Sequence, residues 1–92
     1  MKKLTPSEIT EHLHATPEWR IDNGVLSRTF KFPDFVAAMH FVNAVADAAE
    51  EASHHPDIDI RYDAVTLGLV THDAGGITGS DFALARKADS LA

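Results

Sequence analysis

The chain has 92 residues, of which 45% are hydrophobic, and its formal net charge is −6 with the histidines counted as neutral. This length supports one small core, so we expect a single domain over residues 1–92, because two halves would each fall below the size at which chains usually fold unaided. The acidic balance argues against direct nucleic-acid binding, and the absence of cysteine excludes disulfides, thiolate metal sites and a cysteine nucleophile.

The first predicted element is a short helix from about Pro6 to His14. Thr5-Pro6-Ser7-Glu8 has the form of a capping box with proline at the first helical position. The residues before it include two lysines but no apolar stretch, and nowhere do 18 apolar residues run together. We therefore expect neither a signal peptide nor a membrane span, and a cytoplasmic protein.

A hairpin is predicted next. Trp19 and Ile21 alternate with charged residues, and Asn23-Gly24 is the strongest short signal for a two-residue hairpin turn. The return strand runs from Val25 to Phe32, with apolar side chains on one face and Ser, Thr and Lys on the other.

The longest helix follows Pro33-Asp34 and is ended by Pro56. Its apolar residues recur at helical spacing: Phe35, Met39, Val42, Val45, Ala46 and Ala49. A last helix is capped by Thr78-Gly79-Ser80-Asp81 after a flexible Gly75-Gly76 bend. Its apolar residues are Phe82, Ala85, Ala88 and Leu91.

Between these helices the sequence predicts a second hairpin, formed by 58–62 and 65–69 with Asp63 and Ala64 as its turn. In this register Tyr62 faces Val65, and continuing the pairing sets His55 opposite His72. Opposed residues on antiparallel strands lie roughly 4.5–5.5 Å apart at Cβ. The two segments that contain His54-His55-Pro56 and Thr71-His72-Asp73 should therefore share one pocket rim.

The element order α-β-β-α-β-β-α predicts an α+β fold, a four-stranded antiparallel sheet with three helices packed on one face. The strand order is not readable from the sequence. An open sheet leaves edge strands with unpaired backbone groups, so we expect self-association as a homodimer or homotetramer.

Three of the six histidines form the candidate site. A histidine side chain, with an ordinary pKa of about 6.5, both gives and takes protons near neutrality. His54 and His55 fall in the predicted last turn of the long helix, where a cation also stabilises the helix dipole, but the opposed His72 favours a site. For His12, His14 and His40 a structural or surface role is favoured, because they do not cluster.

Acidic residues stand beside these histidines. Glu50 and Glu51 each precede one of the adjacent histidines by four residues and share its helix face, although Glu51 fits a solvated face better. Asp73 fits two roles equally well, binding of the substrate and hydrogen bonding to the backbone of the turn. Asp81 fits the role of a helix-capping residue. Trp19 fits the core or a pocket wall.

Three histidines and an aspartate are acceptable zinc or iron ligands, but adjacent histidines rarely converge on one ion, so no metal is expected.

Distinctive residues and motifs along nearly the full length of the chain are Trp19, Arg28-Thr29-Phe30-Lys31-Phe32, Phe41-Val42-Asn43, His54-His55-Pro56, Tyr62, Val65, Leu69, Thr71-His72-Asp73, Gly75-Gly76, Thr78 and Asp81. In these residues and their spacing the chain resembles pterin-4a-carbinolamine dehydratases. One departure is Ser80, where many relatives carry a basic residue. The resemblance implies the fold given above and assembly into dimers or tetramers.

The resemblance also implies catalytic histidines at His54, His55 and His72 and acidic pocket residues at Glu50 and Asp81. The implied reaction dehydrates a 4a-hydroxy-tetrahydropterin, left by aromatic amino acid hydroxylases, to quinonoid dihydropterin in tetrahydrobiopterin recycling. It needs proton transfer but no electron carrier, so no cofactor is expected.

His54 or His72 is then the acid, and His55 binds pterin or makes the complementary proton transfer. With Asp73 and Trp19 added, the candidate substrate-binding residues are Glu50, Asp73, Asp81 and Trp19. A non-catalytic protein-binding or assembly module of the same fold is the alternative.

Overall fold

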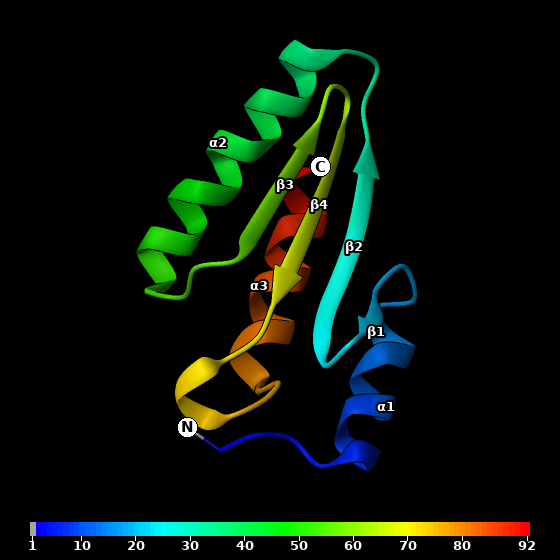
Figure 1. The fold of residues 1–92 in the computed structure, drawn as a ribbon, viewed down its shortest axis with the longest axis vertical. Helices are drawn as coiled ribbons and strands as arrows, with labels where there is room; N and C mark the ends of the chain where they lie inside the picture. The colour runs from blue at the N-terminus through cyan, green and yellow to red at the C-terminus, as the bar shows by residue number, and fades with distance from the viewer. Residues whose placement is uncertain (1) are drawn as a thin grey trace.

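The protein is described by a computed structural model that covers residues 2–92, and its elements follow the predicted order α-β-β-α-β-β-α (Figure 1). The sheet is antiparallel throughout, with strand order β1-β2-β4-β3. The elements are α1 (Pro6–Ala15), β1 (Arg20–Asp22), β2 (Val25–Lys31), α2 (Phe35–Ala52), β3 (Asp57–Arg61), β4 (Ala64–Leu69), the 3-10 turn η1 (His72–Ala74) and α3 (Gly79–Leu91).

The core lies between the sheet and the helical layer of α2 and α3. Strand alternation puts Leu26 and Phe30 of β2 on the inner face, as predicted, beside Val65 and Leu67 of β4, and all four are buried. The outer face carries polar residues. α3 supplies its predicted stripe to the core, with Phe82 fully buried.

The predicted capping box of α1 is present, since the Thr5 hydroxyl accepts from the Glu8 N–H and the Thr5 N–H donates to the Glu8 carboxylate at 2.8 Å. That backbone hydrogen bond lowers the pKa of Glu8 below its ordinary 4.5. The box is therefore intact at neutral pH and is lost only as the pH falls through the lowered pKa. His12 stacks on the Phe82 ring with centroids 4.7 Å apart, which joins α1 to α3.

The turn of the second hairpin differs from the prediction. The observed pairs are Ile60 with Val65 and Ile58 with Leu67, so the turn consists of Tyr62 and Asp63. Tyr62 takes a left-handed φ of 56° and is 70% exposed, where we had placed it in the strand. Pairing ends at Asp57, and the predicted opposition of His55 to His72 within the ladder is wrong.

The inner face of α2 also differs from the prediction. The buried stripe consists of Ala38, Phe41, Val42, Val45 and Ala49, while Phe35 is 48% exposed and Ala46 is exposed. The buried residues still recur at spacings of three and four, but they begin one helical turn later than predicted. The first turn of α2 extends beyond the end of the core, so its side chains are not covered.

α2 ends at Ala52, four residues before Pro56. Ser53 takes a left-handed φ of 52°, its N–H donates to the Glu50 carbonyl, and the His54 N–H donates to the Ala49 carbonyl. These two bonds form a Schellman motif, which satisfies the last helical carbonyls. The adjacent histidines therefore lie in the loop beyond the helix, contrary to the prediction that they occupy its last turn.

Strand β3 is a sheet edge that carries an exposed apolar residue, Ile60, at 38% exposure. We expect self-association through this edge, because it offers unpaired backbone groups. Ile60→Lys should lower the sedimentation coefficient to that of a monomer. Ile21→Lys, at 39% exposure on the opposite edge β1, is the matched control and should not. Equal behaviour of the two variants would contradict association through β3.

None of the helices within residues 2–92 combines the length and the hydropathy that a membrane span requires.

Candidate active site

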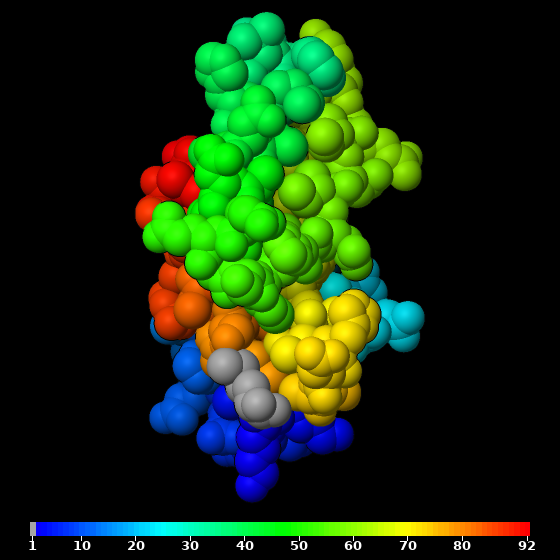
Figure 2. Space-filling model, turned by 90° about the vertical axis from the view of Figure 1, so that its left-hand side faces the viewer, coloured from blue at the N-terminus to red at the C-terminus, as the bar shows by residue number. Residues whose placement is uncertain are grey.

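The loop after α2 and the segment after β4 line an open cavity of about 260 Å³, which we call the histidine cavity. Figure 2 shows the face where the green end of α2 meets the yellow segment around residues 70–76. The lining residues are Ser53, His54, His55, Val70, Thr71, His72 and Asp73. All three predicted catalytic histidines and Asp73 therefore line one cavity, despite the shifted hairpin register.

Backbone pairing fixes the segment that carries His72. Thr71 and Gly76 exchange hydrogen bonds, N to O at 3.0 and 3.3 Å, and close the base of the loop. Gly75 ends η1 with a left-handed φ of 74°, a conformation that glycine adopts without steric cost. The predicted flexible bend is thus a defined turn, and it presents the exposed His72 and Asp73 beside the end of α2.

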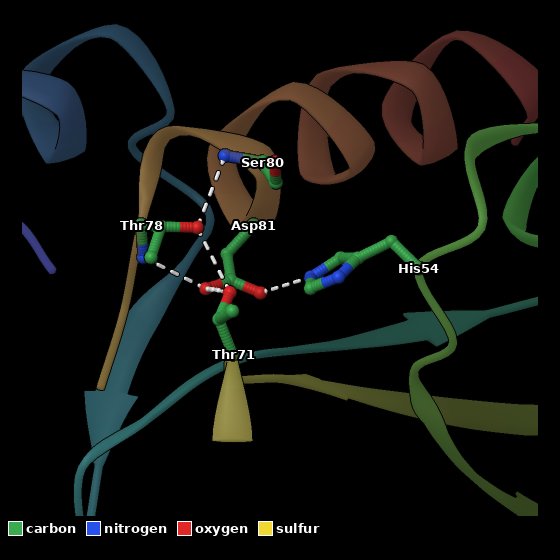
Figure 3. A network of polar contacts seen from close by, with 5 residues as sticks. All are labelled: His54, Thr71, Thr78, Ser80 and Asp81. Carbon is green, nitrogen blue, oxygen red and sulfur yellow. Dashed lines mark hydrogen bonds and ion pairs between the residues drawn. The ribbon is translucent and has the colours of Figure 1, made fainter. Parts of the chain in front are cut away.

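The carboxylate of Asp81 is fully buried and holds His54 (Figure 3). Its Oδ1 lies 2.5 Å from His54 Nε2, and its Oδ2 accepts from the Thr71 hydroxyl at 2.9 Å and the Thr78 N–H at 2.8 Å. Because the Thr71 hydrogen points to Asp81, Thr78 donates its own hydroxyl hydrogen to Thr71, at 2.8 Å. Burial is tolerated because both carboxylate oxygens are satisfied.

This contact fixes the orientation of the imidazole of His54. A carboxylate only accepts hydrogen bonds, so the hydrogen of the His54–Asp81 bond belongs to Nε2. Nδ1 is then the ring nitrogen that this contact leaves available to a ligand. The His54 side chain is 16% exposed, which restricts its access to the cavities that it lines.

Glu50 pairs with the other histidine of the doublet. Its Oε2 lies 2.9 Å from His55 Nε2, and the two side chains are 82% and 66% exposed. We had placed Glu50 on the same helical face as His54, four residues on, but the helix has already ended at that point. An exposed pair of this kind contributes about 1 kcal/mol or less to stability, so its value lies in orienting His55.

Two of the residues named in the sequence analysis lie outside the histidine cavity. Trp19 is 4% exposed, packs edge-on against Phe30 and donates its Nε1–H to Asp89 at 2.9 Å. It lines neither of the cavities described here, so it belongs to the core. Glu51 lies outside the histidine cavity and lines a second one.

The second cavity, of about 420 Å³, lies between α2 and α3, and we call it the interhelical cavity. It shares His54 with the histidine cavity. Its lining residues are Ala48, Glu51, Ala52, His54, Ser80, Ala83, Leu84 and Lys87.

Across residues 2–92, no three histidine, cysteine or acidic side chains are grouped so that they could hold a metal ion. The two adjacent histidines do not converge on one point, because His54 contacts the buried Asp81 and His55 contacts the exposed Glu50.

Sequence reasoning missed Thr71 as a donor to Asp81, and it missed the contribution of α3 to the second cavity. The capping box at Thr78 and Asp81 was predicted and is present. The position of Thr71, directly before His72 at the end of a strand, indicated that it lies near the site. Its hydrogen bond to Asp81 was not predictable, because the two residues are ten positions apart across a turn and no periodic pattern links them.

Comparison with known proteins places the chain in a family. The family model described as pterin 4 alpha carbinolamine dehydratase matches residues 2–91. A protein of Acidobacterium capsulatum that carries the provisional name pterin-4-alpha-carbinolamine dehydratase is 55% identical over 91 residues, 99% of each chain.

Solved structures agree with this assignment. The crystal structure of a transcriptional coactivator/pterin dehydratase from Brucella melitensis superposes with a TM-score of 0.95, at 36% identity over 99% of each chain. A pterin dehydratase-like protein described as a RuBisCO assembly factor in the alpha-carboxysome superposes with a TM-score of 0.69, at 26% identity over 80% of this chain and 88% of that one. The chain belongs to the pterin 4 alpha carbinolamine dehydratase family.

Proposed function

We propose that the protein dehydrates 4a-hydroxy-tetrahydropterins to quinonoid dihydropterins and so supports tetrahydropterin recycling. The observation that carries this proposal is the histidine cavity, which three imidazoles line and in which the buried Asp81 orients one of them. Membership of the family supports the same substrate class.

The reaction is an elimination of water. The bond from C4a to the hydroxyl oxygen breaks, an imidazolium protonates the departing hydroxyl, and a neutral imidazole accepts the proton of N5. The electron pair of the N5–H bond forms the C4a=N5 double bond, so no net oxidation occurs. General acid–base catalysis of this kind contributes typically 10²–10⁴-fold.

We assign the two proton transfers to His54 and His72 and the binding of pterin to His55. His54 presents a defined tautomer, and His72 lines the same cavity from the segment after β4. Two imidazoles from different segments around one cavity suit a reaction that needs both a proton donor and a proton acceptor. Asp73 is the remaining ionisable residue of the lining and supplies an acceptor for ring N–H groups.

The test is the decay of a 4a-hydroxy-tetrahydropterin generated in the assay by an aromatic amino acid hydroxylase. Ultraviolet absorbance follows the decay, and the purified protein should accelerate it in proportion to its concentration. A decay rate that is independent of the protein would refute the proposal.

We expect the dehydration to be independent of metal ions, since acid–base catalysis by imidazoles accounts for the chemistry and the adjacent histidines diverge. Purified protein dialysed against a chelator should keep its full dehydration rate, measured with hydroxylase-generated substrate prepared separately. Loss of activity with recovery upon addition of zinc or iron would contradict this expectation.

A non-catalytic assembly module is the second candidate, favoured by the similarity to the protein described as a RuBisCO assembly factor. The absorbance assay separates the two. A scaffold would leave the decay of the carbinolamine unchanged, and histidine replacements would leave its binding of a protein partner unchanged.

A further inference from the structure

The two cavities share one lining residue just beyond the end of α2. His54 lines both, and the adjacent residues Ala52 and Ser53 line the interhelical and histidine cavities respectively. A ligand that contacts His54 from the histidine cavity is therefore separated from the second cavity by no more than the residues at this end of α2.

The sizes of the cavities indicate how a ligand divides between them. Small-molecule sites commonly measure roughly 300–1,000 Å³. The histidine cavity, at about 260 Å³, is below this range, and the interhelical cavity, at about 420 Å³, is within it. A bicyclic ring held among the three histidines would leave little room there for its substituent.

The walls of the interhelical cavity suit a short polar chain. Ala48, Ala52 and Ala83 contribute methyl groups to the lining, and Glu51 on α2 and Lys87 on α3 contribute its exposed charged groups. Among residues 2–92 neither of these two charged side chains forms an ion pair. A carboxylate and an ammonium group together both accept and donate hydrogen bonds, as the hydroxyl groups of a substituent require.

We infer that the interhelical cavity binds the C6 substituent of the pterin, while the ring reacts in the histidine cavity. This inference rests on the proposed dehydration. It makes Ala83 and Ala48 specificity-determining residues, because any larger side chain there occupies the space that the substituent needs.

The experiment compares two substrates that share the reacting ring and differ in the C6 substituent. The 4a-hydroxy derivative of 6-methyl-tetrahydropterin carries a methyl group there, and that of tetrahydrobiopterin carries a dihydroxypropyl group. Ala83→Leu fills the cavity from α3. Ala83 is exposed and leucine is a good helix former, so the variant should fold. Ala48→Leu fills the cavity from α2, and Ala46→Leu, exposed on α2 and outside both cavities, is the matched control.

For each filling variant, kcat/KM for the dihydroxypropyl substrate should fall about tenfold relative to the methyl substrate, through KM. Ala46→Leu should leave the ratio unchanged. The Kd of 7,8-dihydrobiopterin, measured by fluorescence, should rise in the same two variants. An unchanged ratio in the filling variants, or an equal loss for both substrates, overturns the subsite. A wild-type protein that accelerates neither decay refutes the proposed function, and the subsite with it.

Discussion

Replacing His54 with alanine should lower the dehydration rate at least about tenfold, and His72→Ala should do the same. Each change removes one of the two proposed proton-transfer groups from the histidine cavity and leaves the other lining residues in place. The rate should fall in kcat, because the barrier to proton transfer rises while the ring still binds. Steady-state assays on variants with native circular dichroism measure the effect.

Two comparisons sharpen this expectation. His40→Ala, at an exposed position on α2 outside the cavities, should leave the chemistry nearly unchanged. The double replacement of His54 and His72 should lose less than the product of the single losses, if the pair acts as a unit. Full activity in both single variants would show that the proton-transfer assignment is wrong and would favour the assembly module. His55→Ala should weaken pterin binding.

Replacing Asp81 should have the largest effect on stability. Asp81→Ala leaves the buried Thr78 N–H, the Thr71 hydroxyl and His54 Nε2 without their acceptor. Each buried group left unsatisfied costs about 1–3 kcal/mol. We expect the free energy of unfolding to fall by roughly 3 kcal/mol, allowing for partial access of water to His54. Urea titration followed by tryptophan fluorescence measures it.

Asp81→Asn keeps the volume of the side chain and tests its role in positioning. An amide offers one acceptor oxygen, whereas the carboxylate accepts on both, so either His54 or the threonine pair loses its partner. The variant should lose kcat at nearly constant KM, because His54 is no longer held in one tautomer. A change confined to stability would contradict that role.

Asp89→Asn is the matched control on the same helix. Asp89 accepts from Trp19 Nε1 and from Arg28 at 2.7 Å, away from both cavities. Its replacement should lower stability and leave kcat unchanged.

The second hairpin shows why the faces of the strands were predictable although their register was not. An aromatic residue favours a strand, so Tyr62 was assigned to it, yet the chain turns at Tyr62 with a positive φ. Moving a two-residue turn by one position changes every cross-strand partner by two. Because side chains alternate with a period of two, Ile58 and Val65 still face the core layer.

The candidate site divides in the same way. The grouping of His54, His55 and His72 was predictable, since one hairpin brings both segments to the same end of the molecule. The partner of His54 was not, because local spacing indicated Glu50, whereas the carboxylate comes from α3, 27 residues later in the chain. No periodic pattern links residues so far apart, and the end of α2 at Ala52 had to be known first.

Asp81 accepts two kinds of hydrogen bond, and so it links the proposed catalysis to the local stability of the last helix. Asp81 accepts the Thr78 N–H at the start of α3 and also holds His54. Opening of this single turn would release the imidazole while the sheet remains paired, and such local openings require less free energy than global unfolding. Heating should therefore abolish turnover before the sheet melts, and enzymatic activity becomes a sensitive reporter of fraying at the first turn of α3.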